Sequence, residues 1–354
     1  MHTSTTNTQS PHSEDAKISK KNPTLLYAIS RKERALFLEN SELEFSTLPV
    51  DIVWLDIHEA LTESLLQQIN PEIIVTCWST PPLPKSWLEA DDCQLLYLCH
   101  LAGSVKKIVP RDFIKHGGIV SNWGRLAAEP VAEHALLLAL AALRNLGMWS
   151  HAIEQVDVVG KQSLQLGTRS LIERHVGIHG FGGVARALVR LLQPFRVKIY
   201  AFSEGVSEAV LKEAGVSPCA SLKELCSCSE VLFECEALSS TTTNSVDSTV
   251  LAALPDNAVF VNVARGNLVD EAALLQEASS GRIRLALDVV RNEPLSPNAP
   301  LYLLKDAVLS PHIGGPTLDL YPKFGDFAQA NILRFLRGEL PVAQVTPEIY
   351  DRST

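Results

Sequence analysis

The chain has 354 residues, of which 46% are hydrophobic and 20% charged, and its formal net charge is −9 at pH 7. The length favours two domains, and the composition is that of an ordinary globular protein. The negative charge argues against nucleic acid or an anionic membrane surface as the main partner. The sequence shows neither an apolar run of membrane-spanning length nor the apolar core of a signal peptide, so we expect a cytoplasmic protein.

The N-terminal region and the cysteines lead to two further expectations. Residues 1–22 are almost free of apolar side chains and predict a disordered tail. The seven cysteines are odd in number and contain no C-x-x-C pair, which favours buried, reduced thiols. Cys226 and Cys228 could form part of a metal site, but no second pair nearby completes one, so we expect no metal.

Residues 23–122 alternate short apolar runs with helical patterns and predict a small α/β unit. The expected strands are 25–29, 52–55, 73–77, 95–99 and 119–120. A helical pattern covers 61–69, and a proline-rich loop begins at Thr80. The next helix, over 129–146, is apolar on nearly all sides, so we expect it to be buried between domains or subunits. His134 lies on this helix and is interpreted as structural.

A glycine-rich turn at 177–185 joins a predicted strand to a predicted helix. Its pattern is G-x-G-x-x-A, with Gly180, Gly182 and Ala185 at the defined positions. The first glycine permits the turn, the second lets the backbone approach a pyrophosphate, and the small third residue lets the helix pack closely. Because the N–H groups at the start of a helix face an anion, the sequence predicts nucleotide binding here.

Residues 175–315 continue as a series of strands and helices and predict a doubly wound parallel sheet. The further strands are expected at 197–202, 231–234, 258–263, 285–289 and 307–309. Helices are expected between these strands, for example over 271–279. A last helix, at about 318–336, is expected to return and pack on the first domain.

Three ionisable residues follow predicted strand ends, where open parallel sheets bind their ligands. Arg265 lies in a turn and can bind a carboxylate or polarise a carbonyl, although it could also be a surface arginine that pairs with a helix. Glu293 lies in a loop and could equally be a solvated carboxylate. His312 can move the hydroxyl proton when a hydride leaves the same carbon, but a buried histidine in a Gly/Pro turn is the alternative.

Taken together, these segments resemble the D-isomer-specific 2-hydroxyacid dehydrogenase family, over about residues 95–317. The matching segments, in family order, are 132–135, 177–185, 262–266, 286–289 with 292–295, and 310–313. The resemblance implies a Rossmann domain plus a smaller flavodoxin-like α/β substrate domain completed by the C-terminal helix. The dinucleotide-binding domain would be residues 123–317, and the substrate domain residues 23–122 with 318–354.

The resemblance also implies roles for the three ionisable residues. Arg265 would bind the substrate carboxylate and keto oxygen, and His312 would be the general acid/base. Glu293 would accept a hydrogen bond from His312 and favour the protonated imidazole. Hydride would pass between nicotinamide C4 and substrate C2, while His312 protonates the forming alkoxide and Arg265 offsets its charge.

Further binding residues follow from the resemblance alone. Asp288 would hold the carboxamide end of the nicotinamide, and backbone N–H groups of the run Ala102, Gly103 and Ser104 would cradle the substrate carboxylate. The other cofactor-binding residues would be Gly180, Phe181, Gly182, Gly183, Val184, Ser203, Val263, Ala264 and Gly314. Members of the family are usually dimers, so a homodimer through the helix around 129–146 is expected.

The sequence departs from the family pattern at three places. Ser203, with Glu204 next, stands where an acidic residue usually binds the adenosine ribose; no Arg or Lys lies between Ser203 and Val210. The serine removes the charge that would reject the 2′-phosphate of NADP, so NADP is possible as the cofactor. The absence of Arg and Lys, which would bind that phosphate, favours NAD. Cys235 and Ala237 replace a His-x-Pro segment. Residues 104–108 also differ, and their two lysines could either add charge for a second anionic group or be solvated.

Two classes of function remain open from the sequence. The first is an NAD(P)-dependent oxidoreductase acting on a small 2-hydroxy or 2-keto acid of the glyoxylate, hydroxypyruvate or phosphoglycerate type. The second is a catalytically weak NAD(H)-sensing binding protein of the co-repressor type. The intact set of Arg265, Glu293 and His312 favours the enzyme, and a related dehydrogenase of formate or phosphite is a further alternative.

Overall fold

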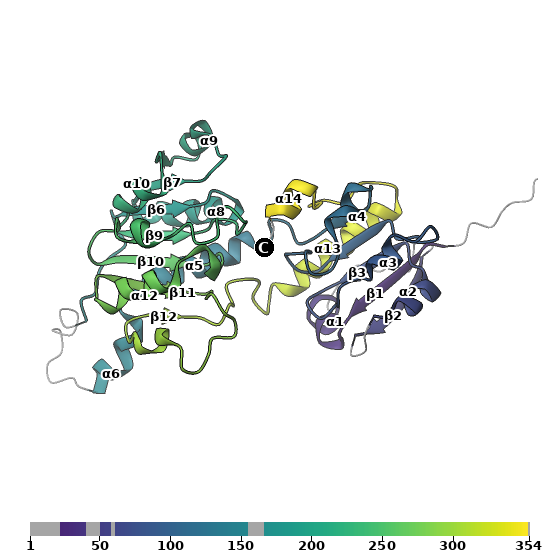
Figure 1. Cartoon of the computed structure of the whole chain (residues 1–354), viewed down its shortest axis with the longest axis horizontal. Coiled ribbons are helices and arrows are strands. Elements are labelled where there is room, and N and C mark those ends of the chain that lie inside the picture. Colours follow the sequence, from purple (N-terminus) through teal and green to yellow (C-terminus); the bar gives the residue numbers. More distant parts are fainter. Residues whose placement is uncertain (1–21, 40–49, 58–60, 155–165, 353–354) are drawn as a thin grey trace, which may run out of the picture.

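The computed structural model describes residues 22–39, 50–57, 61–154 and 166–352 of the chain. These residues form two β-sheets, each built of parallel strands, and the sheets lie side by side along the long axis of the molecule (Figure 1). The strands of the first sheet come from residues 24–121 and those of the second from residues 175–309. Residues 1–21 of the expected tail lie outside the described residues, and the domain boundaries at 122/123 and 317/318 stay a prediction.

The first sheet has five strands in the order β2-β1-β3-β4-β5, and all neighbouring strands are parallel. The strands are β1 (Thr24–Ile29), β2 (Asp51–Asp56), β3 (Ile73–Thr76), β4 (Tyr97–His100) and β5 (Ile119–Ser121). The helices that follow them are α1 (Arg31–Leu38), α2 (Glu63–Ile69), α3 (Lys85–Leu88) and α4 (Arg111–Lys115). Strands β1, β3 and β4 are fully buried, which explains their nearly continuous apolar sequences. The order 2-1-3-4-5 is flavodoxin-like and confirms this part of the fold prediction.

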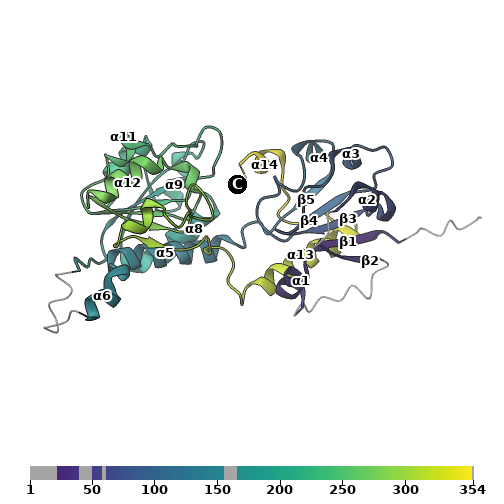
Figure 2. The same ribbon diagram turned by 60° about the horizontal axis from the view of Figure 1, so that its bottom comes forward.

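The C-terminal region returns to the first sheet. It forms α13 (Tyr321–Leu336) and α14 (Pro347–Arg352). Figure 2 shows α13 lying against one face of the first sheet, where Phe324, Ala328 and Ile332 share a hydrophobic core with Phe37 of α1. Gly325 allows this contact, because a Cβ there would overlap the backbone carbonyl of Phe37. The packing confirms that the C-terminal helix completes the first α/β unit.

The second sheet has seven parallel strands in the order β12-β11-β10-β9-β6-β7-β8. They are β6 (His175–His179), β7 (Lys198–Phe202), β8 (Ser217–Pro218), β9 (Val231–Glu234), β10 (Ala258–Asn262), β11 (Ile283–Leu287) and β12 (Val308–Leu309). The order reverses at β6, which pairs with β7 on one side and β9 on the other, as in a doubly wound fold. This confirms the Rossmann prediction.

Helices cover both faces of the second sheet. The helices between residues 128 and 279 are α5 (Ala128–Leu143), α6 (Trp149–Glu154), α8 (Gly183–Leu192), α9 (Glu208–Glu213), α10 (Leu222–Ser227), α11 (Ser248–Leu251) and α12 (Glu271–Ser279), and α6 projects away from the sheet. Short 3₁₀ turns lie at Leu146–Met148, Gln193–Phe195, Gly266–Leu268 and Pro300–Leu303. Helices α5 and α8 pack on one face against Val259 and Val261, and α10 to α12 pack on the other against Phe260.

The apolar helix predicted over 129–146 is α5, which ends three residues earlier than expected. Asn145 has a φ of 56°, in the left-handed region, and so turns the chain out of the helix. Buried alanines such as Ala135, Ala139 and Ala142 let α5 lie close to the sheet and to α8. Within the described ranges, no helix is both long and apolar enough to cross a membrane.

Candidate active site

A cavity of about 780 Å³ lies between the carboxyl ends of the second sheet and the first α/β unit. Trp78 and Trp123 line it from the side of the first sheet. From the second sheet it is lined by four residues predicted to belong to the site: Val263, Arg265, Asp288 and His312. Gly314, predicted to contact a cofactor, also lines it. The structure therefore brings the predicted arginine and histidine to one cavity.

Arg265 owes its position to the turn that follows β10. The side chain of Asn262 closes this turn, since its Oδ1 accepts a hydrogen bond from the N–H of Ala264 at 3.0 Å and its Nδ2 donates to the carbonyl of Arg265 at 3.1 Å. The next residue, Gly266, packs against the backbone of Val290 where a Cβ would overlap. Burial lowers the pKa of Arg265, and the charge of Glu293 opposes that shift. The result is a partly buried guanidinium at the edge of the cavity.

His312 is held by its backbone and by one ring nitrogen. Its φ of 55° is in the left-handed region, which is uncommon for residues other than glycine and recurs at functional sites. Its N–H donates to the carbonyl of Asp288 at 2.9 Å, and its Nδ1 lies 2.6 Å from Oε2 of Glu293. Because Nδ1 is engaged, Nε2 is the ring nitrogen that can exchange a proton with a ligand.

Glu293 stands behind the histidine and is absent from the residues that line the 780 Å³ cavity. Its Oε1 accepts a hydrogen bond from the N–H of Val290 at 3.1 Å, so both of its oxygens are engaged. The two side chains are partly exposed, 36% for Glu293 and 47% for His312. This geometry makes Glu293 a group that orients His312 rather than one that meets a ligand in this cavity.

Asp288 is the buried anchor of the loop that carries His312. Its Oδ1 accepts hydrogen bonds from Ser310 Oγ at 2.6 Å and from the N–H of Ile313 at 2.9 Å, and its Oδ2 accepts from the N–H of Gly314 at 2.8 Å. Nε2 of His134 lies 3.3 Å from Oδ1 and 2.9 Å from the Ser310 hydroxyl. Burial alone would raise the pKa of Asp288, but these hydrogen bonds together lower it to about 2. His134 thus fits the structural role predicted for it.

Asp288 should therefore make the stability of the fold depend on pH. Because its pKa falls from 3.8 to about 2 on folding, the carboxylate stabilises the folded state above pH 4 and loses this effect as the pH falls toward 2. The linked contribution is about 2 kcal/mol. We expect Asp288→Asn to lower the free energy of unfolding at pH 7 by about that amount or more, because an amide also loses acceptor capacity.

Urea unfolding at pH 7, 4 and 3 measures this effect, with Asp91→Asn on an exposed turn as the control. The gap between the wild type and Asp288→Asn should narrow between pH 4 and 3. An equal stability of the two proteins at pH 7, or a gap that stays constant down to pH 3, would contradict the assignment of Asp288 as the ionised anchor.

The glycine turn predicted to bind a nucleotide lies at the end of β6. Gly180 has a φ of 84°, and a Cβ there would lie 2.5 Å from the Cα of Glu236, so only glycine fits. Gly182 is exposed and directly precedes α8 as its N-cap residue. No side chain caps this helix, so its first N–H groups are available to an anion. Phe181 is buried. The turn and the uncapped helix fit the pyrophosphate of a dinucleotide.

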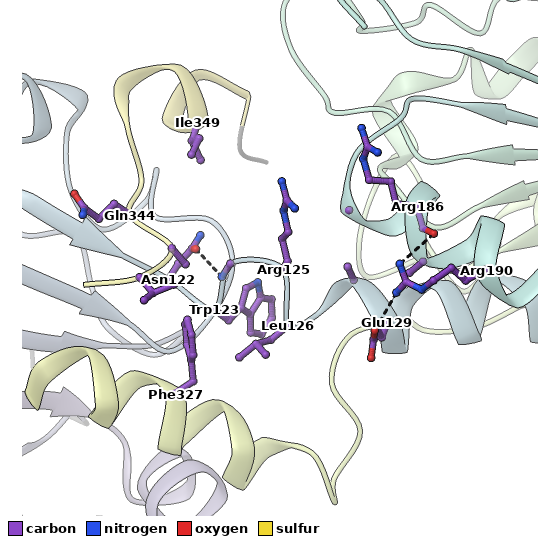
Figure 3. A pocket seen from close by; sticks show the side chains of 16 residues that line it. Asn122, Trp123, Arg125, Leu126, Glu129, Arg186, Arg190, Phe327, Gln344 and Ile349 are labelled. Atoms are coloured by element: carbon purple, nitrogen blue, oxygen red, sulfur yellow. Dashed lines mark hydrogen bonds and ion pairs between the residues drawn. The ribbon is translucent and has the colours of Figure 1, made fainter. Parts of the chain in front are cut away.

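A second cavity, of about 820 Å³, opens beside the start of α8 (Figure 3). Gly183 lines it, and Arg125 and Arg186 stand on opposite walls and extend in the same direction. Arg190 differs because it is paired with Glu129 at 3.0 Å. Sequence reasoning singled out neither Arg125 nor Arg186. The available clue for Arg186 was its spacing, one helical turn after Gly183.

The run of Ala102, Gly103 and Ser104 follows β4 but does not line the 780 Å³ cavity. Trp123, which lines the cavity, packs against this run. The N–H of Trp123 donates to the carbonyl of Ala102 at 3.3 Å, and a Cβ on Gly103 would lie 3.0 Å from the indole ring. Asn122 holds the same run through a hydrogen bond to the Gly103 carbonyl at 2.5 Å. Trp123 thus separates the predicted carboxylate cradle from Arg265 and His312.

Comparison with known proteins gives a consistent result. Residues 136–314 match the family model described as D-isomer specific 2-hydroxyacid dehydrogenase, NAD binding domain. The glyoxylate reductase/hydroxypyruvate reductase of Mus musculus is 30% identical over 270 residues, which cover 74% of this chain and 80% of that protein. The glyoxylate reductase of Pyrococcus furiosus is 27% identical over 84% of this chain and 89% of its own length. The crystal structure of a glyoxylate reductase from Paecilomyes thermophila superposes with a TM-score of 0.71 at 24% identity, over 92% of this chain and 99% of that chain.

Proposed function

The chain belongs to the D-isomer specific 2-hydroxyacid dehydrogenase family, and from this premise we propose that it reduces a small 2-keto acid to the D-2-hydroxy acid. Its cofactor is NAD(P), which supplies the hydride when it is bound. The observation that carries the proposal is the meeting of Arg265 and His312 at one cavity, on the sheet that also carries the glycine turn. Glyoxylate and hydroxypyruvate are the substrates named in the relatives reported above, and we propose that class for this chain.

Arg265 and His312 divide the work at the substrate in this mechanism. The guanidinium of Arg265 binds the carboxylate and the keto oxygen, and its positive charge stabilises the negative charge that develops on that oxygen. His312, protonated and facing the cavity through Nε2, gives its proton to the same oxygen. In the oxidising direction His312 removes the hydroxyl proton. Glu293 holds Nδ1 at 2.6 Å and thereby fixes which nitrogen faces the substrate.

The substrate carboxylate meets the first α/β unit in this proposal. The backbone N–H groups of the run 102–104 are its proposed cradle, and Trp123 lies between this run and the cavity. In the proposed division into a substrate domain and a dinucleotide-binding domain, the two domains close over the ligand. This closure would move Trp123, bring the run 102–104 to the substrate carboxylate and exclude water.

The cofactor is proposed to lie along the carboxyl edge of the second sheet. The turn of Gly180, Phe181, Gly182, Gly183 and Val184 would hold the pyrophosphate, and the charges of Arg125 and Arg186 support an anion beside it. At the nicotinamide end, Val263 and Gly314 line the 780 Å³ cavity and would form the wall together with the neighbouring Ala264. The remaining acceptor capacity of Asp288 would bind the carboxamide.

We also propose a homodimer through the face that contains α5, and a cytoplasmic location. Large apolar side chains are exposed on α5, on its neighbours α6 and α8 and on the adjoining segments, and include Leu137 at 56% and Ile153 at 74% exposure; the others are Leu126, Leu146, Trp149 and Leu191. Such a group supports burial against a second copy. None of the seven cysteines, all in the described part of the chain, is in a disulfide, which supports a reducing compartment.

Steady-state oxidation of NADH and NADPH tests the proposal. Purified protein is offered glyoxylate, hydroxypyruvate, pyruvate and bulkier 2-keto acids, and absorbance at the reduced-nicotinamide band is followed. We expect turnover with the small acids and a falling kcat/KM as the side chain grows, because Trp78 and Trp123 narrow the cavity. Absence of turnover with every acid, while NADH binding is still detected by fluorescence, would refute the proposed activity.

A further inference from the structure

We propose that Glu236 is the acid that binds the ribose hydroxyls of the adenosine half and makes the chain select NAD over NADP. The end of β7, where an acidic residue usually does this, carries Ser203 instead. The inference rests on the proposed function, since it assigns a residue to its cofactor site. It is argued from the position of the Glu236 carboxylate relative to the ends of the neighbouring strands β9, β6 and β7.

Glu236 lies against the glycine turn although it comes from another strand. After β9 ends at Glu234, the N–H of Cys235 donates to the carbonyl of His179 at 2.9 Å, so the chain continues beside the end of β6. A Cβ on Gly180 would lie 2.6 Å from the backbone nitrogen of Glu236 and 2.5 Å from its Cα. The first glycine of the nucleotide turn is therefore in direct contact with this residue.

The carboxylate of Glu236 reaches the position left by the missing acid. The hydroxyl of Ser203, at the end of β7, donates to its Oε2 at 3.1 Å. Its Oε1 accepts a hydrogen bond from the N–H of Ala237 at 2.8 Å. Because β6 lies between β9 and β7, the side chain spans the end of the central strand. A serine at 203 and a glutamate at 236 together place one carboxylate where a single aspartate would otherwise stand.

A buried ion pair holds the backbone of Glu236 in place. Glu234 has no exposed surface, and its Oε1 accepts a hydrogen bond from the N–H of Glu236 at 2.8 Å. Its Oε2 lies 2.6 Å from Nδ1 of His179. Burial would lower the pKa of His179, but the charge and hydrogen bond of Glu234, with the charge of Glu236, raise it overall. The carboxylate at 236 is thus preorganised before any ligand binds.

The chemistry of this position discriminates between the two dinucleotides. A carboxylate accepts hydrogen bonds from the adjacent 2′- and 3′-hydroxyls of ribose, and it repels a 2′-phosphate that carries up to about two negative charges. No Arg or Lys between Ser203 and Val210 offsets that repulsion. Glu204, the next residue in sequence, is the competing acid; it is exposed and follows the end of β7.

Dissociation constants for NADH and NADPH, measured by fluorescence on the purified full-length protein, test the inference without requiring turnover. We expect the wild type to bind NADH more tightly than NADPH. The Glu236→Gln variant should weaken NADH binding about tenfold and tighten NADPH binding, because a neutral amide replaces the charged acceptor. Glu236→Asp should retain the preference for NADH in part, and Glu204→Gln should leave the ratio of the two constants within about twofold.

Three results would overturn the inference: a wild type that prefers NADPH, an unchanged ratio in Glu236→Gln, or a change of ratio in Glu204→Gln alone. If Glu236→Gln unfolds, the ratio in Ser203→Ala decides, because loss of the orienting hydroxyl should lower the preference for NADH severalfold, whereas an unchanged ratio would speak against the role of Glu236. Failure of the proposed function is a separate result, since it shows as absent 2-keto acid reduction with cofactor binding intact.

Discussion

Replacement of His312 by alanine is expected to lower kcat for 2-keto acid reduction by about 10³-fold or more, the scale of a lost general acid. The dissociation constant of NADH should stay within about threefold of the wild type, because the glycine turn and Glu236 lie at other strand ends. The physical reason is that Nε2 of His312 is the ring nitrogen left to face the cavity once Nδ1 is paired with Glu293 at 2.6 Å. Stopped-flow and steady-state measurements of NADH oxidation give kcat, and fluorescence titration gives the dissociation constant.

The matched control for this experiment is His116→Ala, at the end of α4 and remote from the cavity, which should leave kcat unchanged. Alanine keeps the Cβ that disfavours a left-handed backbone conformation, so His312→Ala does not relieve it, and the melting temperature of the variant is measured alongside. Near-normal turnover in a folded His312→Ala variant would show that His312 is not the general acid. Equal loss of kcat and of NADH binding would instead indicate that the loop anchored by Asp288 had collapsed.

Replacement of Arg265 is expected to have a similarly large effect on kcat/KM, with a rise in KM that His312→Ala does not show. The guanidinium supplies charge-assisted hydrogen bonds to the carboxylate and stabilises the developing charge on the keto oxygen. Its loss in Arg265→Ala should lower kcat/KM by about 10³-fold, which corresponds to about 4 kcal/mol of transition-state stabilisation. Arg265→Lys should recover only part of this, because an ammonium cannot bind a carboxylate in the same bidentate way.

Two measurements separate this role from a structural one. Added guanidinium should partly restore the turnover of Arg265→Ala, because the vacated space is on the cavity wall, and it should not restore His312→Ala. Arg196→Gln, which breaks an exposed ion pair with Glu173, serves as a control for loss of a positive charge elsewhere. An unchanged KM for the 2-keto acid in Arg265→Ala would argue that the arginine does not bind the substrate.

The sequence predicted the order of strands and helices well because most strands of a doubly covered parallel sheet are apolar throughout. The strand β8 was not predicted, because it has only two residues, Ser217 is exposed and Pro218 only partly buried, and no apolar run marks it. The helix over 129–146 was predicted three residues too long, because apolar periodicity continues past Asn145 while the backbone leaves the helix there. Local sequence patterns of this kind predict whether a segment is a helix or a strand better than they predict the residue at which it ends.

The candidate site was predictable where function is tied to short motifs at strand ends. Arg265, Glu293 and His312 each lie in such a segment, and the topology of the second sheet brings the segments to one edge. Glu236 could not be predicted from the chain order, because its contact with Ser203 crosses from β9 over β6 to β7. Nor does the sequence show that Trp123 stands between the run 102–104 and the cavity, since that depends on how the two halves of the molecule pack.

The most direct test of the account is to follow the hydride itself. NADH carrying deuterium at both C4 positions is offered with glyoxylate, pyruvate and hydroxypyruvate, and the products are examined by mass spectrometry, NMR and chiral chromatography. We expect one deuterium at C2 of the hydroxy acid formed from every acid that turns over, and the D-isomer of the products of pyruvate and hydroxypyruvate. Product without deuterium at C2, or an L-isomer, would contradict the proposed function of this cavity.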